Sequence, residues 1–531
     1  MTNATTDPTA ARLAGCALVV ALAGMLIGCA SLPDSVQRPV SQARTDVADT
    51  RLAAVAAASM PEGSRELSGM RLLPAGDQAF EARIALARAA EKTIDAQYYQ
   101  IADDTSGRQF LRELSAAAAR GVRVRLLVDD LHAAGEDALL AGLAARPNVE
   151  LRMFNPLPVR DGSVGSRVLF SLHEFSRVNR RMHNKLFVAD NSFAVTGGRN
   201  VADEYFGRSE PANFIDMDIL SAGPVVPELS MVFDGYWNSE RAYPIQSLAA
   251  QEGGPDAARR HFDEAVQESA AVDLPVASRD ALGQSSVGTQ LAGGRVELYM
   301  ANVRVLADAP SKAAEAGHAQ LEDGAVMNGK LELLQSARAE VLVASPYFVP
   351  GRRMLDVLRQ AAASQVRVSV MTNSLGTTDE PLVHFGYARH RSALLQMGVS
   401  LFELMPDTEV RQSAGELSGS LGRLHAKVAV VDQRWLYIGS MNMDRRSAHS
   451  NTEMGLIVDS PALAGQVASL LSSERLPRSY QVRSRRDHQG LQWVAQAAGQ
   501  EQVVLNAEPN STWGLQLRLS LVSMVVNEEL L

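Results

Sequence analysis

The chain has 531 residues, which is enough for a large buried core and for about two to four average domains. Its formal net charge of −9 argues against a protein whose main partner is nucleic acid, because binding along a phosphate backbone normally requires a basic surface. Both cysteines, Cys16 and Cys29, precede residue 30, so the rest of the chain has no thiol and no disulfide.

The N-terminus resembles the signal sequence of a bacterial lipoprotein. Arg12 is followed by an apolar run over residues 13–28, which closes with Leu-Ile-Gly immediately before Cys29. We expect residues 1–28 to be a signal peptide, Cys29 to carry lipid, and the folded part to lie on the periplasmic side of the inner or outer membrane. The alternative is an uncleaved transmembrane anchor, because residues 13–32 just reach the roughly 20 uncharged residues that a spanning helix needs.

Residues 29–64 are rich in Ala, Ser, Pro and Arg, and their pattern allows a helix around residues 43–58. They offer few bulky apolar side chains, which indicates a tether. A first α/β half is expected over residues 65–250. Within it, helical spacing over residues 80–90 and 110–119 alternates with strand-like runs over residues 93–101 and 122–128. This alternation is typical of a β-α-β crossover.

Residues 251–325 are expected to connect the halves, and within them residues 251–294 have low apolar density and are predicted to form a helix and a loop. The second half, residues 326–475, repeats the first, with strands over residues 340–348 and 366–372 around a helix over residues 354–363. The C-terminal segment, residues 476–531, contains a basic stretch over residues 478–486 and a strand-like run over residues 513–526. The basic stretch is either a solvated face or a contact for lipid headgroups.

A His-x-Lys-x4-Asp tetrad occurs once in each half, and each copy is followed by Gly-x-x-Asn. The members pair at a constant spacing of 242 residues, as His183 with His425, Lys185 with Lys427, Asp190 with Asp432, and Asn200 with Asn442. Only five of the 51 lysine and arginine residues are lysines, so the presence of a lysine in both tetrads indicates a specific need for lysine. The alternating pattern around each tetrad predicts a strand with His and Lys on one face.

An imidazole beside a fixed cation suits chemistry on a phosphodiester. If the two copies face each other, one histidine attacks phosphorus in line while the other protonates the leaving oxygen, and the roles reverse when the second acceptor arrives. The first product is then a phosphohistidine. A compact ammonium group can follow the phosphoryl group through inversion better than a planar guanidinium can.

Other polar residues of the repeat have predicted roles around this chemistry. Asn200, Asn442 and Ser440 can donate hydrogen bonds to the phosphate oxygens, and no metal-ligand spacing is present, so no metal and no cofactor is expected. Asp216 and Glu453 lie at equivalent places, 237 residues apart, and are predicted to orient the histidines. The tetrad aspartates are expected on the opposite strand face, in structural ion pairs.

Together with the stretches 94–99, 180–185, 197–206, 372–375 and 451–455, these motifs resemble the phospholipase D superfamily, and within it the cardiolipin synthase C branch. The resemblance runs from about residue 67 to the C-terminus. It implies an α/β fold of two repeated α/β/α-sandwich halves with mixed sheets, related by a pseudo-two-fold axis around one shared active site. It also implies a monomer with an internal pseudo-dimer and catalysis without metal.

Residue by residue, the resemblance implies that His183 is the nucleophile and that His425 is the general acid and base. The phosphate ligands are then Lys185, Lys427, Asn200, Asn442 and Ser440. The first copy departs from the usual pattern, since Gly198 stands where the second copy has Ser440.

The implied reaction moves a phosphatidyl group from one phospholipid to the headgroup of another, with phosphatidylglycerol and phosphatidylethanolamine as substrates. A phospholipid hydrolase that releases phosphatidic acid is the alternative. A nuclease is disfavoured by the acidic charge, the membrane tether and the fused repeat. A lipid-binding protein without activity is disfavoured because both tetrads are complete.

Overall fold

The structure is a computed structural model that describes residues 32–512 apart from 34, 161, 172–173, 249–252, 268–276, 314–323, 407–420, 486–489 and 496–501, together with Gly514 and Arg518. The expected signal peptide, Cys29 and nearly all of the strand-like run over residues 513–526 lie outside the described residues. Among the helices of the described residues, none combines the length and the apolarity required to cross a membrane.

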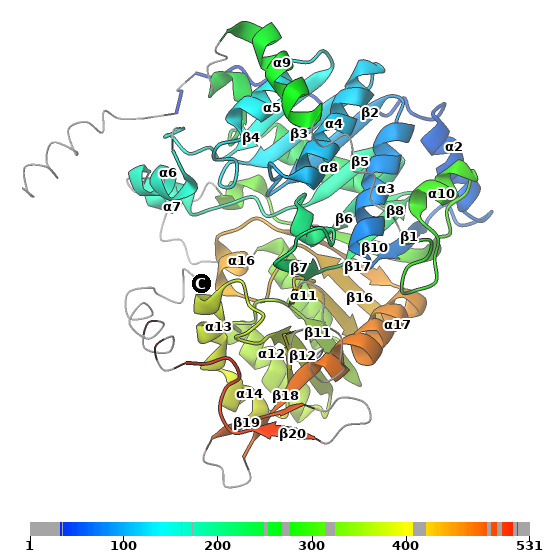
Figure 1. The fold of residues 1–531 in the computed structure, drawn as a ribbon. Helices are drawn as coiled ribbons and strands as arrows, with labels where there is room; N and C mark the ends of the chain where they lie inside the picture. Colours follow the sequence, from blue (N-terminus) through cyan, green and yellow to red (C-terminus); the bar gives the residue numbers. More distant parts are fainter. Residues whose placement is uncertain are drawn as a thin grey trace, which may run out of the picture.

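Each half contains a mixed sheet, and Figure 1 shows the first half above the second. The strand order is the same in both. In the first half the order in space is β4 (Val149–Phe154), β3 (Arg123–Asp129), β2 (Thr93–Tyr98), β5 (Leu186–Ala189), β6 (Phe193–Gly197), β8 (Asp218–Ala222) and β1 (Ser68–Leu73). In the second it is β13 (Ser400–Leu404), β12 (Arg367–Asn373), β11 (Glu340–Ala344), β15 (Val428–Val431), β16 (Trp435–Gly439), β17 (Met454–Asp459) and β10 (Tyr299–Ala307). The predicted duplication is therefore confirmed.

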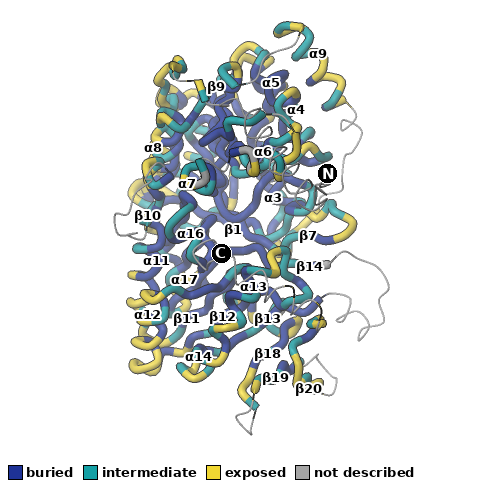
Figure 2. Tube along the Cα trace, turned by 90° about the vertical axis from the view of Figure 1, so that its left-hand side faces the viewer, coloured by how far each residue is buried: buried dark blue, intermediate teal, exposed yellow. Residues whose placement is uncertain are grey.

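The two half-sheets are continuous. Strands β1 and β10 pair antiparallel, from Ser68 opposite Ala301 to Met70 opposite Tyr299. This pairing joins both halves into one 18-stranded sheet, which is extended at its edges by β9 (Ala242–Pro244) and by β18 (Ser479–Ser484), β19 (Leu491–Ala495) and β20 (Val503–Leu505). Figure 2 shows buried chain running without interruption from one half to the other.

Helices cover both faces of the sheet. The outer face of the first half packs against α3 (Gly76–Ala89), α4 (Thr105–Ala119) and α5 (Asp137–Ala144), and that of the second half against α11 (Ala325–Gln335), α12 (Arg352–Ala363) and α13 (Pro381–Ala388). The opposite face packs against α8 (Val225–Trp237) and α17 (Pro461–Leu470) in a core that both halves share. Strand β3 shows why the central strands read as apolar runs, since Leu126 and Leu127 are buried on opposite faces.

The predicted helices and strands of the two crossovers are confirmed, but the tetrads differ from the expectation. Strands β5 and β15 begin one residue after Lys185 and Lys427, so His and Lys precede each strand. The reason lies outside the local pattern, because the backbone before each strand hydrogen-bonds to the other half of the molecule.

The segment expected as a tether packs against the first half from about residue 38 onward. The N–H groups of Ser41 and Ala43 donate to side chains of Asn238 and Asp234 at the end of α8, at 3.1 and 2.8 Å. A helix, α2 (Arg51–Ser59), follows. The connecting segment also contains β10, which follows the range predicted to form a helix and a loop.

Candidate active site

His183 is placed by the second half of the molecule. Its N–H donates to the carbonyl oxygen of Thr452 at 2.9 Å, and Met182 and Thr452 form an isolated parallel bridge. The chain then enters β5, where it rejoins the sheet of the first half. This short crossing segment carries the histidine to the boundary between the halves.

His425 is placed in the reciprocal way by the first half. The strand before it, β14 (Leu421–Leu424), pairs in parallel with β7 (Ala212–Ile215), and the N–H of His425 donates to the carbonyl oxygen of Ile215 at 2.8 Å. The tetrads thus meet at the boundary, as expected for one site shared by two repeated halves.

Each histidine lies against a carboxylate from the opposite half. Nδ1 of His183 is 3.1 and 2.9 Å from the two carboxylate oxygens of Glu453, and Nδ1 of His425 is 2.6 Å from Oδ2 of Asp216. These are the two acids that the repeat singles out. Because the acid contacts Nδ1, Nε2 is the other nitrogen of each ring and is not held by that acid.

The two copies hold their acids differently. Ser440 donates its hydroxyl hydrogen to Oε2 of Glu453 at 2.5 Å and accepts from the N–H of Met454 at 3.0 Å. At the equivalent position, a Cβ on Gly198 would lie 2.2 Å from Oδ1 of Asp216, so only glycine leaves room for that carboxylate. In this arrangement the Ser440 hydroxyl contacts the orienting acid, which differs from the phosphate contact expected from the resemblance.

Both tetrad lysines are buried beside their own histidines. Nζ of Lys185 donates to the carbonyl oxygen of His183 at 2.8 Å and lies 5.2 Å from the centre of the Tyr99 ring. Nζ of Lys427 donates to the carbonyl oxygen of His425 at 2.5 Å and lies 2.8 and 3.0 Å from its two ring nitrogens. Burial lowers the pKa of both ammonium groups, to about 8 for Lys427.

The two asparagines are buried with an unsatisfied amide atom in each copy. Oδ1 of Asn200 and Oδ1 of Asn442 have no hydrogen-bond partner among the described residues, while Nδ2 of Asn200 donates to the Tyr205 hydroxyl at 2.9 Å. The assignment of amide oxygen and nitrogen can be exchanged without changing shape. A buried amide atom without a partner among the described residues, at the same position in both copies, fits a polar ligand in the site.

The two histidine–acid pairs differ electrostatically. Burial raises the pKa of Glu453 to about 7. Burial also disfavours ionisation of Asp216, but the charge of His425 and its hydrogen bond hold the pKa of Asp216 well below its usual range. Burial, together with the charges of Lys185 and Lys427, lowers the pKa of His183 well below its ordinary value. The two pairs therefore differ in charge: the imidazole of His183 is neutral in one pair, and the carboxylate of Asp216 is ionised in the other.

The tetrad aspartates lie in hairpin turns and bind backbone N–H groups. Asp190 accepts from Glu91, Lys92 and Thr93, and Asp432 from Arg338, Ala339 and Glu340, at 2.8 to 2.9 Å. Both have positive φ, 47° and 51°, as does the residue that follows each. The contacts recorded for these carboxylates in the described part of the chain are thus to backbone rather than to cations, which corrects the expected ion pairs.

Aromatic side chains that the motifs do not include pack against the histidines. Tyr99 lies with its ring centre 5.1 Å from His183, while Tyr205 and Phe214 lie 5.1 and 4.7 Å from His425. Tyr99 and Tyr205 fall in the stretches that carry the resemblance, so a signal for them existed. Phe214 has no such signal, because it reaches the site only through the pairing of β7 with β14.

Known proteins are similar to this chain over most of its length. A family model described as cardiolipin synthase, PLD-like domain, matches residues 84–237 and 331–474. Cardiolipin synthase C of Escherichia coli K12 is 35% identical over 458 residues, which cover 85% of this chain and 94% of that protein. A cardiolipin synthase of Staphylococcus aureus Mu50 is 25% identical, over 78% of this chain and 70% of its own.

Among solved structures, the crystal structure of phosphatidylserine synthase from Haemophilus influenzae Rd KW20 has the same fold. The match has a TM-score of 0.55 at 14% sequence identity and covers 88% of this chain and 97% of that one. The chain therefore belongs to the phospholipase D superfamily of phospholipid enzymes, in its cardiolipin synthase branch.

Proposed function

We propose that the protein transfers a phosphatidyl group from one phospholipid, phosphatidylethanolamine, to the glycerol headgroup of phosphatidylglycerol, and so makes cardiolipin. The observation that carries the proposal is the pair of histidines held at one boundary, each by an acid of the opposite half, with two buried lysines beside them. The similarity to cardiolipin synthases over most of the chain supports transfer to a lipid alcohol.

In the first step, Nε2 of His183 attacks phosphorus and the bond from phosphorus to the headgroup oxygen breaks. His183 suits attack because burial and the nearby lysines keep its imidazole neutral. His425 donates a proton to the leaving oxygen. Burial and the charge of Lys427 lower the pKa of His425, and the ionised Asp216 partly offsets this by stabilising the imidazolium form. The products are ethanolamine and a phosphatidyl group bonded to His183.

In the second step the roles reverse. His425, now neutral, accepts the proton of a headgroup hydroxyl of phosphatidylglycerol, whose oxygen attacks phosphorus and displaces His183. Lys185 and Lys427 offset the negative charge that develops on the phosphate oxygens, and Asn200 and Asn442 donate to the same oxygens. Water as the acceptor would give phosphatidic acid by the same steps.

The same proposal places the enzyme at a membrane surface. A lipid on Cys29 would hold the folded part on the periplasmic side, where its substrates lie in the plane of the bilayer. Detection of the lipid on an N-terminal peptide by mass spectrometry tests this point, and an unmodified, uncleaved N-terminus would contradict it.

The function is tested by supplying the full chain with phosphatidylglycerol alone, with added phosphatidylethanolamine, and with DNA. We expect cardiolipin and free ethanolamine in the mixed lipids. Phosphatidic acid alone would identify a hydrolase, and cut DNA a nuclease. His183→Ala and His425→Ala should each lower turnover by at least about 10³-fold, whereas His261→Ala, at an exposed position in α9 (Gly254–Gln267), should not.

A further inference from the structure

Lys330 is a buried lysine that the proposed mechanism does not use. The chain has five lysines, and the three that are buried are the two of the tetrads and Lys330, which lies in α11. Its Nζ donates to the carbonyl oxygen of Met441 at 3.2 Å and lies 4.4 Å from the centre of the Tyr437 ring. Met441 stands between Ser440 and Asn442, so this cation is bonded to the backbone that carries two residues of the site.

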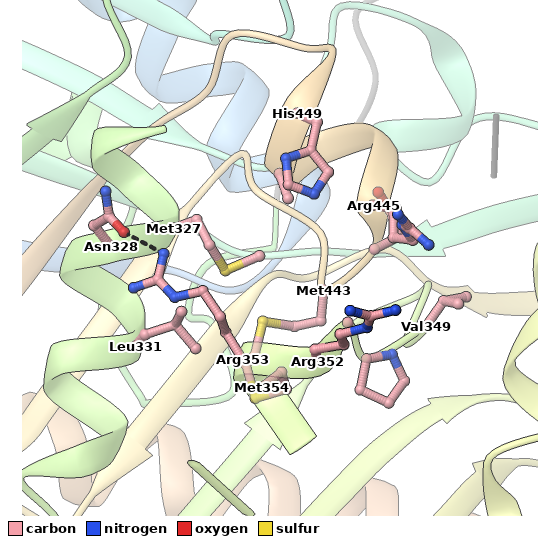
Figure 3. Close-up of a pocket in the computed structure, with 14 residues that line it drawn as sticks. Met327, Asn328, Leu331, Val349, Arg352, Arg353, Met354, Met443, Arg445 and His449 are labelled. Carbon is pink, nitrogen blue, oxygen red and sulfur yellow. Dashed lines mark hydrogen bonds between the residues drawn. The ribbon is translucent and has the colours of Figure 1, made fainter. Parts of the chain in front are cut away.

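The chain after Asn442 borders a cavity. A space of about 790 Å³ lies between α11, the start of α12 and residues 443–449, and Figure 3 shows Met327 and Leu331 of α11 around it together with Met443. A loop beside a cavity has fewer packing contacts to fix its backbone than a loop inside a close-packed core. A hydrogen bond from α11 to this loop therefore has more to contribute to the position of Asn442.

The first half holds the equivalent loop in a different way. Arg199 is equivalent to Met441, because each stands one residue before the asparagine of its repeat. The guanidinium of Arg199 donates to the carbonyl oxygens of Leu73 at 2.9 Å, Pro74 at 2.7 Å and Tyr205 at 3.2 Å. The side chain of Met441 has no donor, so a side-chain anchor for the second loop has to come from another element.

Lys330 occupies the place that Arg83 has in the first half. The two are 247 residues apart, as are Thr93 and Glu340, whose N–H groups bind the tetrad aspartates of their own halves. Arg83 is fully buried and pairs with the carboxylate of Asp218 at 2.9 Å. The equivalent cation of the first half is therefore neutralised by an ion pair.

The second half has glycine at the position of Asp218. Gly455 stands there, at the same offset of 237 residues that relates the two orienting acids. A Cβ on Gly455 would lie 2.8 Å from the hydroxyl oxygen of Tyr437, so the Tyr437 ring fills the space that a side chain there would need. The ammonium of Lys330 thus lies over an aromatic ring instead of beside a carboxylate. Burial lowers the pKa of Lys330 to about 7, and the charge of Glu453 opposes this lowering.

We propose that Lys330 is a positioning residue for the reaction: its ammonium group holds the carbonyl of Met441 and thereby fixes the residues on either side of it around the phosphate. One of these, Ser440, donates to Glu453, and the other, Asn442, carries an amide oxygen without a partner among the described residues. The inference rests on the proposed function, since it concerns the same phosphate site.

Lys330→Met tests this role, because methionine has a similar length and no donor. In the full chain with dihexanoyl phosphatidylethanolamine and phosphatidylglycerol, we expect kcat to fall by about tenfold or more and KM to change by less than about twofold. The reason is that donors of the loop act most strongly on charge that develops in the transition state. The assay measures ethanolamine release, so the comparison holds for either a lipid acceptor or water.

The matched control is Lys92→Met, which makes the same chemical change in the first half, where the Lys92 side chain contacts Asp49. It should keep the kcat of the original protein. Lys330→Arg keeps the cation and its donors, as Arg83 does in the first half, and should recover kcat to within about threefold. A Lys330→Met protein as active as Lys92→Met, or a Lys330→Arg protein no more active than Lys330→Met, would overturn the inference.

Thermal unfolding separates positioning from a role in stability alone. Lys330→Met should unfold at the same temperature as the original protein or at a higher one, because burying an ammonium group is costly and burying a thioether is not. A loss of kcat accompanied by a lower unfolding temperature would instead assign Lys330 to stability and overturn the inference.

A titration with inorganic phosphate keeps this inference separate from the proposed function. Calorimetry should show that Lys330→Met binds phosphate about three- to tenfold more weakly than Lys92→Met, because the charge of the dianion requires the donors of the loop. Weaker phosphate binding in a protein that releases no ethanolamine would refute the proposed function and leave the positioning role standing. Equal phosphate affinities in the two variants would overturn the positioning role.

Discussion

Gly198 is the residue at which the two copies of the site differ most. Any side chain there would collide with the carboxylate of Asp216, since a Cβ would lie 2.2 and 2.7 Å from its two oxygens. Gly198→Ser, which copies Ser440, should therefore displace Asp216 from Nδ1 of His425 and lower turnover by about 10- to 100-fold. Turnover of phospholipid by the purified protein is the measurement.

Gly235→Ser is the matched control, because nothing lies within 4 Å of a Cβ at that position of α8. It should keep the turnover of the original protein. If Gly198→Ser were as active as Gly235→Ser, the contact between Asp216 and His425 would not matter for the reaction.

Glu453 gives the protein a pH dependence that can be isolated by one substitution. Its folded pKa of about 7 lies above the ordinary value of 4.5, so the folded state binds this proton more tightly than the unfolded state. The resulting stabilisation is fully present below about pH 4.5 and is lost as the pH rises through 7. Glu453→Gln cannot lose a proton, so the variant should gain stability relative to the original protein between pH 5 and 8.

We expect that relative gain to be about 1–3 kcal/mol, measured as the difference between the two proteins in free energy of unfolding by denaturant at each pH. The difference removes the contributions of groups that titrate in both proteins and do not contact Glu453. A difference that did not change with pH would mean that Glu453 is ionised throughout this range.

The sequence predicted the residues of the site better than their pairing. Asp216 and Glu453 were found because the repeat aligns them, but alignment of two halves reports equivalence and not contact. That Glu453 holds His183 and Asp216 holds His425 depends on how the halves pack against each other. The contact of Ser440 with Glu453 was missed for the same reason.

At the scale of elements, the hairpins after β5 and β15 explain the aspartate of each tetrad. Residues Asp190 and Asn191, and Asp432 and Gln433, have positive φ, which a tight hairpin turn with the twist of its strands requires. Each carboxylate also ties the turn to the backbone that enters the neighbouring strand, β2 or β11. Asp supplies both properties, since it tolerates left-handed φ and accepts several N–H bonds.

The two aspartates should differ in what they contribute to stability. Asp190 is fully buried, whereas Asp432 is partly exposed, and its partners Arg338 and Ala339 are exposed. Asp190→Ala should lower the free energy of unfolding by about 2–4 kcal/mol, and Asp432→Ala by about 1–2 kcal/mol, because water can replace the lost acceptor only in the second case. Denaturant unfolding at pH 7 measures both.

The corresponding Asn variants keep the preference for left-handed φ and one acceptor oxygen, so each should cost less than its Ala counterpart. Equal losses at the two positions would contradict the argument from burial.

Local pattern was enough for the crossover elements but not for segments that depend on distant partners. Spacing of apolar residues predicted β2, α4, β3 and their repeats. The packing of the segment before residue 60 and the strand β10 have little local signal, because Asp234, Asn238 and the strands β1 and β17 stabilise them. The partners lie more than 150 residues away in the sequence, so a pattern of neighbouring residues cannot predict these contacts.

At the scale of the whole molecule, the two halves form one unit. They share the sheet through β1 and β10 and a core that contains residues of both α8 and α17. The duplication was readable from spacing alone, whereas the continuous sheet was not, because only the pairing of β1 with β10 produces it. The site lies where this shared packing brings the tetrads together, so it requires both halves.

Because each histidine contacts an acid from the other half of its own chain, one chain should contain one complete site. Purified His183→Ala and His425→Ala proteins, each inactive, should therefore remain inactive when mixed or when produced together. Phospholipid turnover of the mixture at equal concentrations measures this. Recovery toward about a quarter of the original activity would mean that halves of different chains combine in one site, since random pairing of two chains restores that fraction of sites.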